Sequence, residues 1–422
     1  MQKLHIMASL PFNFLARSEL LSTFFPTWLW QGREWRKGHV PRYDPHYWFN
    51  AHSHPVLSTY YPTHILSAIV GTFLPLDTAF NLYIIHYLLH FVFMLAGWYT
   101  VFAASFVNLI ALFGAITMTF QACHLKQQAC IVYTLSWFPW MLHGLISHNV
   151  ILSSVSIGMM LLAGYYPLAV FLLPVSLIFW QWLPIGVGFL IGLPQLIPFF
   201  KYLPRTIRGS VKAPSDSPTE NKFYFGLTPI VILILSYNPI YLVITIPILF
   251  RLFKSTLMRV PQRAMILSCY GAIYFCLLEM RTMSNTQIAA LTLIQAFDLW
   301  LINRDCLPPR PFCELWEKPS RAFNTKLTRF LEKNLGDGRV AGLPYPLFTG
   351  HINGFKTIGY CGSMQNNLMW KWRKSFKHDP FLDGVNGDDI TRYRVRFAYS
   401  RKKLPWQNTE VPNLYLNPNY SN

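Results

Sequence analysis

The chain has 422 residues, of which 52% are hydrophobic, 16% aromatic and only 13% charged. A soluble globular protein carries roughly a quarter charged residues, so this composition excludes an ordinary soluble protein and indicates a surface that meets lipid. The net charge of +18 fits contact with anionic lipid headgroups, and because no nucleic-acid motif accompanies it, nucleic acid is not an expected partner.

The N-terminal region, residues 1–78, is expected to lie at the membrane interface. Residues 1–16 have neither a long apolar core nor a small-residue cleavage site, so they make a poor signal peptide, and we expect a first membrane helix to be missing. Residues 17–64 are polar and aromatic, and too long and irregular for a simple connector. The many Trp and Tyr residues fit anchoring at the headgroup level, with sugar stacking or a polyprenyl groove as the alternative.

Residues 79–303 are expected to form a transmembrane domain. Apolar runs follow one another with tight breaks, each close to the ~20 residues that cross a ~30 Å hydrocarbon core. Helices are expected because lipid offers no partner for backbone N–H and C=O groups. The sequence predicts about ten spans, at 79–103, 105–121, 128–146, 150–164, 166–181, 183–199, 225–236, 239–253, 263–279 and 285–302.

Residues 304–422 are expected to form a small polar domain, β-rich or mixed. Gly and Pro interrupt short aromatic and β-branched runs, and RYRVRFAY at 392–399 alternates with a period of two. A bridge between Cys306 and Cys313 would require an oxidising compartment, which the odd count of seven cysteines leaves open. The fold class is therefore an all-α polytopic membrane bundle with a small C-terminal domain.

Lys and Arg are distributed unevenly across the predicted spans. The N-terminal region, the 200–223 loop, the segment from Lys254 to Arg263 and the C-terminal domain all fall on one side of the membrane. Because basic residues near membrane ends favour the cytoplasm, this bias alone places that side inside the cell.

Several motifs in chain order resemble those of YfhO-like bacterial membrane proteins. The segment from 18 to 45 ends in the turn GHVPRYDP and is followed by YYPTH at 60–64, and WFPW stands at 137–140. PQLIPFFKYLPRTIR at 194–208 and MRVPQRAMIL at 258–267 are similar to further signatures of that family. The resemblance covers roughly residues 19–302, and GRVAGLPYPLFTGHIN in the C-terminal segment also looks familiar.

YfhO-like proteins are placed with the GT-C class of membrane glycosyltransferases, which take sugar from a polyprenyl-phosphate donor at the outer membrane face. The resemblance implies this chemistry, with Glu19 at the position of the acidic residue of the first outer loop and Asp44 as a second candidate. The sequence departs from the family pattern in the missing first helix, in Glu instead of Asp, and in a charge bias that opposes an outer loop.

The expected chemistry needs a carboxylate near the acceptor hydroxyl and cations for the phosphate leaving group. Beyond the two carboxylates, the candidate phosphate-binding residues are Arg205, Arg208, Arg259 and Arg263, all on the predicted side of Glu19 and Asp44. Arg offers phosphate a bidentate fork. The ordinary alternative is that these arginines extend to lipid headgroups at helix ends.

Histidines also gather in the N-terminal region. His52 and His54 are candidate substrate-binding residues, and with His46, His64 and Asp44 they raise the alternative of a divalent metal. No distal pair completes a known metal signature, so neither a metal site nor a cofactor is assigned. His86 and His90, four residues apart on a predicted span, are expected to point into the bundle.

The sequence thus predicts a multi-pass protein of the bacterial inner (plasma) membrane. Its expected partners are membrane lipids, a polyprenyl-phosphate sugar and a cell-envelope acceptor. A transporter or lipid-handling protein without covalent chemistry is the alternative, which polar residues within the spans such as His86 and Gln195 favour. A non-catalytic member of the enzyme family is a third reading.

Overall fold

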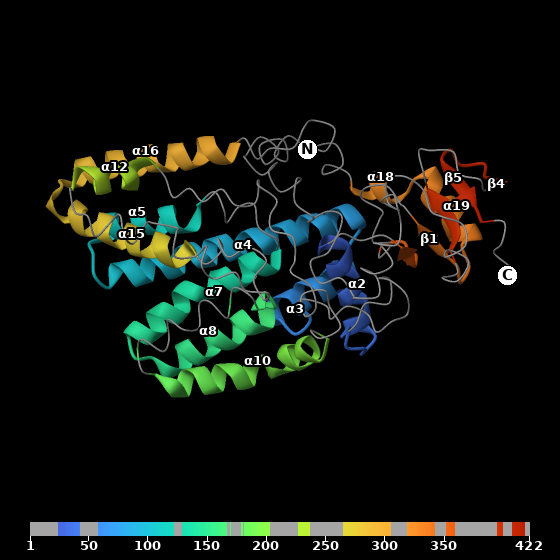
Figure 1. Cartoon of the computed structure of the whole chain (residues 1–422), viewed down its shortest axis with the longest axis horizontal. Helices are drawn as coiled ribbons and strands as arrows, with labels where there is room; N and C mark the ends of the chain where they lie inside the picture. Colours follow the sequence, from blue (N-terminus) through green and yellow to red (C-terminus); the bar gives the residue numbers. More distant parts are fainter. Residues whose placement is uncertain are drawn as a thin grey trace, which may run out of the picture. The chain divides into compact units, whose positions relative to one another are not determined.

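A computed structural model describes residues 24–42, 58–121, 129–166, 169, 179, 181–202, 227–236, 265–304, 319–341, 352–358, 395–399 and 407–417. Within these residues the chain is mostly helical and has one small sheet (Figure 1). The chain divides into two compact units. We call the described residues of 84–197 and 213–309 the helical unit, and those of 19–83, 198–212 and 310–422 the mixed unit.

The helical unit is built from apolar helices. Its elements are α4 (Leu76–Ala103, which begins in the mixed unit), α5 (Asn108–Thr119), α7 (Ala129–Ile146), α8 (Val150–Ala163), α10 (Trp182–Tyr202, which ends in the mixed unit), α12 (Leu227–Leu235), α15 (Met265–Glu279), the 3-10 turn η5 (Met280–Thr282) and α16 (Asn285–Arg304).

These helices overlap eight of the ten predicted segments, while 166–181 and 239–253 lie largely outside the described residues. Among the residues that the structure describes, three helices, α4, α7 and α10, are long and apolar enough to cross a membrane. The prediction of about ten spans goes beyond these three and stays a prediction.

Helices α7 and α8 pack as a tight hairpin. Asn149 is the N-cap of α8, and its side-chain oxygen accepts a hydrogen bond of 2.9 Å from the backbone N–H of Leu152. A Cβ at Gly144 would lie 2.6 Å from the hydroxyl of Ser153, so only a glycine permits this approach of the two helices. The hairpin therefore depends on a helix N-cap and on a missing side chain.

Glycines also bring α8 and α10 together. Gly188 and Gly192 stand one turn apart on α10, and a Cβ at Gly192 would lie 2.6 Å from the Cβ of Leu161. On α8, a Cβ at Gly158 would collide with Ile191 in the same way. Close packing through small residues is the usual basis of helix association in lipid, where hydrophobic burial gives little advantage.

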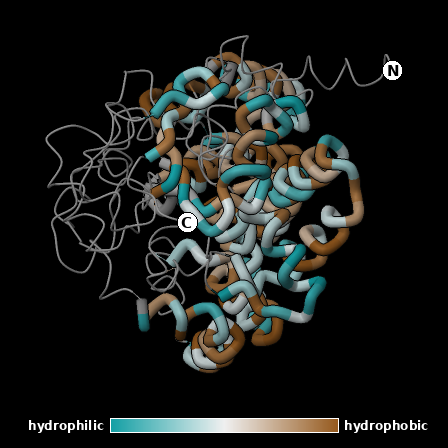
Figure 2. The backbone as a smooth tube through the Cα atoms, turned by 90° about the vertical axis from the view of Figure 1, so that its right-hand side faces the viewer, coloured by the Kyte–Doolittle hydropathy of each residue, from teal (hydrophilic) through white to brown (hydrophobic). Residues whose placement is uncertain are grey.

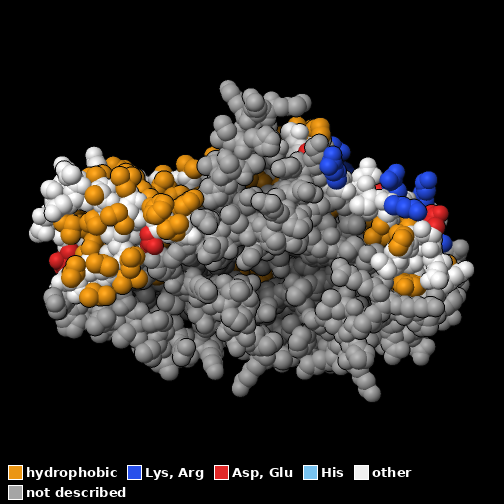
Figure 3. All heavy atoms as spheres, turned by 90° about the horizontal axis from the view of Figure 1, so that it is seen from above, with side chains coloured by type: hydrophobic (Ala, Val, Ile, Leu, Met, Phe, Trp, Pro, Cys, Tyr) orange, Lys and Arg blue, Asp and Glu red, His pale blue; other side chains and the backbone are white. Residues whose placement is uncertain are grey.

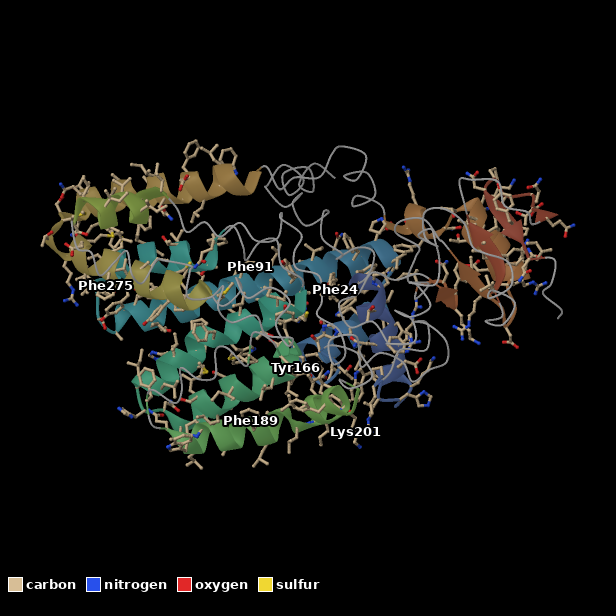
Figure 4. The ribbon with its side chains drawn as sticks, in the orientation of Figure 1. Phe24, Phe91, Tyr166, Phe189, Lys201 and Phe275 are labelled. Carbon is tan, nitrogen blue, oxygen red and sulfur yellow. The ribbon has the colours of Figure 1, made fainter. Side chains whose placement is uncertain are left out.

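Many large apolar side chains of the helical unit point outward. On α10, Phe189, which is labelled in Figure 4, is 39% exposed and Leu190 66%, and on α16 Leu293 is 72% exposed. Figure 3 shows many hydrophobic side chains on the visible face of the part that holds α12 and α16, and Figure 2 shows hydrophobic residues interleaved with more polar ones along the backbone. Outward-facing apolar side chains in this density suit lipid and not water.

The mixed unit combines two N-terminal helices with short C-terminal elements. These are α2 (Phe25–Arg36), α3 (Pro62–Gly71), α18 (Pro319–Phe323), α19 (Lys326–Asn334), β1 (Arg339–Ala341), β2 (Thr357–Ile358), β3 (Val395–Tyr399), β4 (Gln407–Asn408) and β5 (Leu414–Leu416). The strand order is β2-β1-β3-β5-β4; β1 pairs in parallel with β2 and β3, whereas β5 is antiparallel to β3 and β4. Strand β3 confirms the strand predicted from RYRVRFAY.

Two contacts tie the N-terminal helices to the C-terminal elements inside the mixed unit. The carboxylate of Asp77, in the first turn of α4, accepts hydrogen bonds from the backbone N–H of Ser320 at 2.7 Å and from its hydroxyl at 2.8 Å. The guanidinium of Arg33 donates to the carbonyl of Ile352 at 3.2 Å. The division of the chain into regions 1–78, 79–303 and 304–422 stays a prediction.

Candidate functional site

The site residues named from the sequence lie outside the described residues. This holds for the two carboxylates and for the six cationic or imidazole side chains, namely Glu19, Asp44, Arg205, Arg208, Arg259, Arg263, His52 and His54. The described part of the same N-terminal region is the α2–α3 hairpin, which we define as residues 24–42 and 58–73. Among the described residues, this hairpin holds both a buried polar network and a group of charged side chains, and we take it as the candidate site.

Aromatic packing fixes α2 in place. Phe25 and Trp28 are fully buried, and both rings contact Tyr83 on the first turns of α4, at centroid distances of 5.8 and 5.3 Å. Phe25 also meets Phe80 edge-on at 5.0 Å. Buried aromatic pairs of this geometry contribute roughly 0.5–1.5 kcal/mol each beyond the burial of their area, so this cluster is a firm base for the hairpin.

Two glycines allow α2 and α3 to touch. A Cβ at Gly32 would collide with the backbone carbonyl of Ala68, and a Cβ at Gly71 would collide with the ring of Trp28. The indole N–H of Trp28 in turn donates to the hydroxyl of Ser67 at 3.2 Å. The two helices therefore pack backbone against side chain, and the polar groups between them are enclosed.

A buried polar network occupies the interior of the hairpin. Gln31 is 1% exposed and His64 7%, and the amide oxygen of Gln31 accepts a short hydrogen bond from Nε2 of His64. The amide nitrogen of Gln31 donates to the hydroxyl of Thr59 at 3.4 Å, and the indole of Trp35 donates to the carbonyl of Thr59 at 3.3 Å. An amide oxygen only accepts, so Nε2 of His64 carries the proton and this tautomer is fixed.

The last turn of α2 concentrates charge. The Glu34 carboxylate pairs with Lys37 at 2.8 Å and with His39 at 3.3 Å. Gly38, with φ of 79°, ends the helix, and the backbone N–H of His39 reaches the carbonyl of Glu34 at 2.9 Å, as in a Schellman motif. Both oxygens of Glu34 are thus engaged, so this carboxylate is better suited to hold the end of the helix than to act as a general base. We call Glu34, Lys37 and His39 the clasp.

Burial and partners shift the pKa of Glu34 in opposite directions. Desolvation raises the pKa of the carboxyl, but the hydrogen bonds and charges of Lys37 and His39 lower it by more, so its pKa lies below the ordinary value. Glu34 therefore remains ionised in the folded protein at neutral pH.

Three arginines are close to the clasp in sequence: Arg33 and Arg36 on α2, and Arg42 after it. Within the described residues, Arg33, Arg36 and Arg42 form no ion pair with a carboxylate. Their hydrogen bonds go to neutral oxygens: Arg36 donates to the hydroxyl of Thr72 at 3.4 Å, Arg42 to the hydroxyl of Tyr60 at 3.0 Å, and Arg33 to the carbonyl of Ile352. Burial, and then the charge of Arg36, lower the pKa of Arg33, so the hairpin would gain from a bound anion.

A second polar cluster lies inside the helical unit. On α4, His86 and His90 are 7% and 6% exposed, which confirms that they point into the bundle. Nδ1 of His86 lies 3.1 Å from the hydroxyl of Tyr133 on α7, and Nδ1 of His90 donates to the carbonyl of His86 at 2.8 Å. Tyr166, labelled in Figure 4, also donates to a carbonyl, that of Gln195 at 3.1 Å.

Metal ligands are not gathered in the described part of the chain. There, no group of three or more His, Cys, Asp or Glu side chains is placed to hold an ion. Of the histidines in the metal alternative, His64 is hydrogen-bonded to Gln31, whereas His46, His52 and His54 lie outside the described residues.

Sequence reasoning missed Gln31, Arg33, Glu34 and Arg36. The available signal was the charge spacing in GREWRK, because Arg33, Arg36 and Lys37 are three and four residues apart and so share one helical face. That spacing becomes visible only once residues 25–36 are treated as a helix.

The chain was compared with known families and proteins. It matches no family model, no curated protein and no solved structure.

Proposed function

We propose that this chain is a multi-pass protein of the bacterial inner membrane that transfers a glycosyl group from a polyprenyl-phosphate donor to a cell-envelope acceptor. The proposal rests on the ordered motifs that resemble those of YfhO-like proteins. The structural observation that supports it most directly is the α2–α3 hairpin, which contains Arg33, Arg36 and Arg42 and leads into α4, a helix long and apolar enough to cross a membrane.

The lipid-facing character of the helical unit supports the membrane part of the proposal. A polyprenyl phosphate keeps its chain in the hydrocarbon and its phosphate at the interface, so an enzyme that uses it needs helices in lipid and cations at headgroup level. The exposed apolar side chains of α10 and α16 fit the first requirement. The arginines of the hairpin fit the second, since they donate to neutral oxygens and not to carboxylates among the described residues.

The proposed reaction uses the residues expected from the sequence. A carboxylate, Glu19 or Asp44, takes the proton of the acceptor hydroxyl while the hydroxyl oxygen forms a bond to the anomeric carbon. The bond from that carbon to the phosphate oxygen breaks, and the electron pair leaves with the polyprenyl phosphate. Arg205, Arg208, Arg259 and Arg263, together with His52 and His54, are proposed to bind the phosphate and the sugar.

The test replaces each carboxylate by its amide. If the proposal holds, Glu19→Gln or Asp44→Asn abolishes a glycan modification in cells, with a rate loss of roughly 100-fold or more, because general-base catalysis contributes at least that factor. The protein level and membrane insertion of both variants should stay normal. The matched control is Asp337→Asn, an exposed carboxylate in a turn of the mixed unit, which should leave modification unchanged. Wild-type modification in both carboxylate variants would refute the assignment.

A transporter or lipid-handling role is the second candidate, and the His86–Tyr133–His90 cluster favours it. Ionisable side chains buried among apolar helices are costly in lipid and often line a path for protons or polar solutes. In this alternative the cluster between α4 and α7 binds the solute, and no covalent bond changes. The membrane orientation of the α2–α3 hairpin separates the two candidates, because the transferase requires it at the outer face and the transport alternative is favoured by a cytoplasmic location.

A further inference from the structure

We propose that the outward face of α3 and the adjoining Arg36 form a contact surface for anionic phospholipid headgroups. We call this surface the α3 face and define it by Leu66, Val70, Phe73 and Arg36. It does not depend on glycosyl transfer, and it assigns a lipid class to one side of the hairpin.

The two sides of α3 differ in what they meet. His64, Ala68 and Gly71 are buried against α2, at spacings of four and three residues. Leu66, Val70 and Phe73 follow the same spacing on the outward side and are 67%, 45% and 69% exposed. The outward stripe contains no charged side chain, so it is unsuited to water along its whole length.

The length of α3 places it on a membrane and not across one. Its ten residues extend about 15 Å, half of the ~30 Å hydrocarbon thickness. A helix too short to span, with one face packed on α2 and an exposed apolar stripe on the other, suits the interface, where those side chains meet the boundary between headgroups and acyl chains. The chain then continues through Pro75 into α4, so the α3 face adjoins a helix that is long and apolar enough to cross the membrane.

Arg36 adds charge to one end of the stripe. Its guanidinium lies 5.2 Å from the centre of the Phe73 ring and donates to the hydroxyl of Thr72 at 3.4 Å. Phe73 is therefore both the last residue of the apolar stripe and the support of a cation. A headgroup phosphate next to this guanidinium would receive charge-assisted hydrogen bonds while Phe73 inserts beside the glycerol backbone.

The balance of charge on the hairpin favours an anionic lipid over a zwitterionic one. Its described residues carry four Lys or Arg side chains and one carboxylate, and Glu34 is already engaged by Lys37. One such cation near an anionic surface contributes about five-fold to binding. A second copy of this chain would present the same positive charge to Arg36, which argues against a symmetric protein contact at this face.

The experiment measures amide hydrogen exchange of α3 in the full-length chain, held in nanodiscs of phosphatidylcholine alone or with phosphatidylglycerol added. We expect exchange in residues 62–73 to be slower in the anionic discs by roughly five-fold, the factor for one cation–phosphate contact. Arg36→Gln should abolish this difference. Arg329→Gln, which removes an exposed arginine of α19, is the matched control and should preserve it.

Leu66→Ser tests the apolar part of the surface and should speed exchange of α3 in both lipid mixtures. Equal exchange of the wild-type α3 in the two mixtures would overturn the proposal. Protection by inorganic phosphate in phosphatidylcholine discs would also overturn it, because it would indicate a site for soluble anions. Protection only in discs that hold two chains would assign the face to a second copy. None of these readings uses transferase activity, so they are independent of the proposed function.

Discussion

At the last turn of α2, one carboxylate holds the ammonium of Lys37 and the imidazole of His39 where the helix ends. Glu34 accepts from Lys37 and His39 while its own carbonyl receives the backbone N–H of His39. Lys37 is well exposed, so water screens the pair, and its contribution to stability is less than about 1 kcal/mol. The clasp therefore positions the end of α2 more than it stabilises the whole protein.

The pH dependence of this clasp follows from the lowered pKa of Glu34. A carboxyl whose pKa is lower in the folded than in the unfolded chain stabilises the fold above its unfolded pKa, near 4.5, and this contribution is lost as the pH falls through the folded pKa. Glu34→Gln should therefore reduce the free energy of unfolding by about 0.3–1 kcal/mol above pH 5. The difference from wild type should shrink below pH 4.5 in denaturation curves recorded in detergent.

The control for this prediction is Glu410→Gln, which removes an exposed carboxylate that is in neither of the two ion pairs found among the described residues. Its free energy of unfolding should follow that of wild type at each pH. A difference between Glu34→Gln and wild type that stays unchanged from above pH 5 to well below pH 4.5 would contradict the role given to the clasp.

Of the buried polar residues, only some could be predicted from the sequence. His86 and His90 were placed correctly inside the bundle, because their spacing of four puts both on one face of an apolar helix. Gln31 and Arg33 were missed, because burial of a polar residue depends on partners distant in sequence, here His64 on α3 and Ile352 in a turn of the C-terminal part. The proposed catalytic pair, Glu19 and Asp44, lies outside the described residues and stays a prediction.

At the scale of elements, helix α10 packs against α8 through glycines on one side only. Gly188 and Gly192 are buried against α8, whereas a Cβ at Gly186, on the exposed side, would meet nothing within 4 Å. The same helix thus contains both the test positions and their control.

Gly188→Ala and Gly192→Ala should each destabilise the protein by about 1–3 kcal/mol, the usual cost of overpacking. Gly186→Ala should be neutral or stabilising by up to about 1 kcal/mol, because Ala is the better helix former. Thermal unfolding of the three variants in the same detergent measures both effects. Equal unfolding temperatures for all three would mean that α8 and α10 do not touch through these glycines.

Element positions were predictable where hydropathy decides them. Eight predicted segments coincide with helices since a long apolar run has few alternatives to a helix in lipid. The α2–α3 hairpin was not predicted, because residues 17–64 mix Trp, Arg and Glu without a long apolar run, and α2 buries aromatic side chains around polar Gln31. Its helical form depends on packing against α3 and α4, which a local pattern does not reveal.

At the scale of the whole molecule, the mixed unit brings the N-terminal hairpin and the C-terminal elements to the same side of any membrane. Arg33 bonds to Ile352 and Asp77 bonds to Ser320, and no bilayer can separate groups within hydrogen-bond distance. This agrees with the expectation from the charge distribution that both regions share one side.

Impermeant maleimide labelling of His39→Cys and Lys326→Cys in intact cells measures that side. Both positions are exposed, whereas the native Cys130, Cys269 and Cys276 are buried. Labelling of the parent chain, which contains all seven native cysteines, gives the background to subtract. The transferase proposal predicts labelling of both positions from outside. Protection of both would support a cytoplasmic orientation and the alternative of binding or transport, whereas opposite results at the two positions would contradict the contacts of the mixed unit.

The joint between Asp77 and Ser320 also has a consequence for biogenesis. The two residues are 243 positions apart, so at about 5–20 residues per second the ribosome needs roughly 12–50 s between them. During that time α4 has already been made, while the partners of Asp77 and Arg33 do not yet exist. The first half of the mixed unit must therefore wait beside the translocation machinery, and it can close only after the intervening helices have been synthesised.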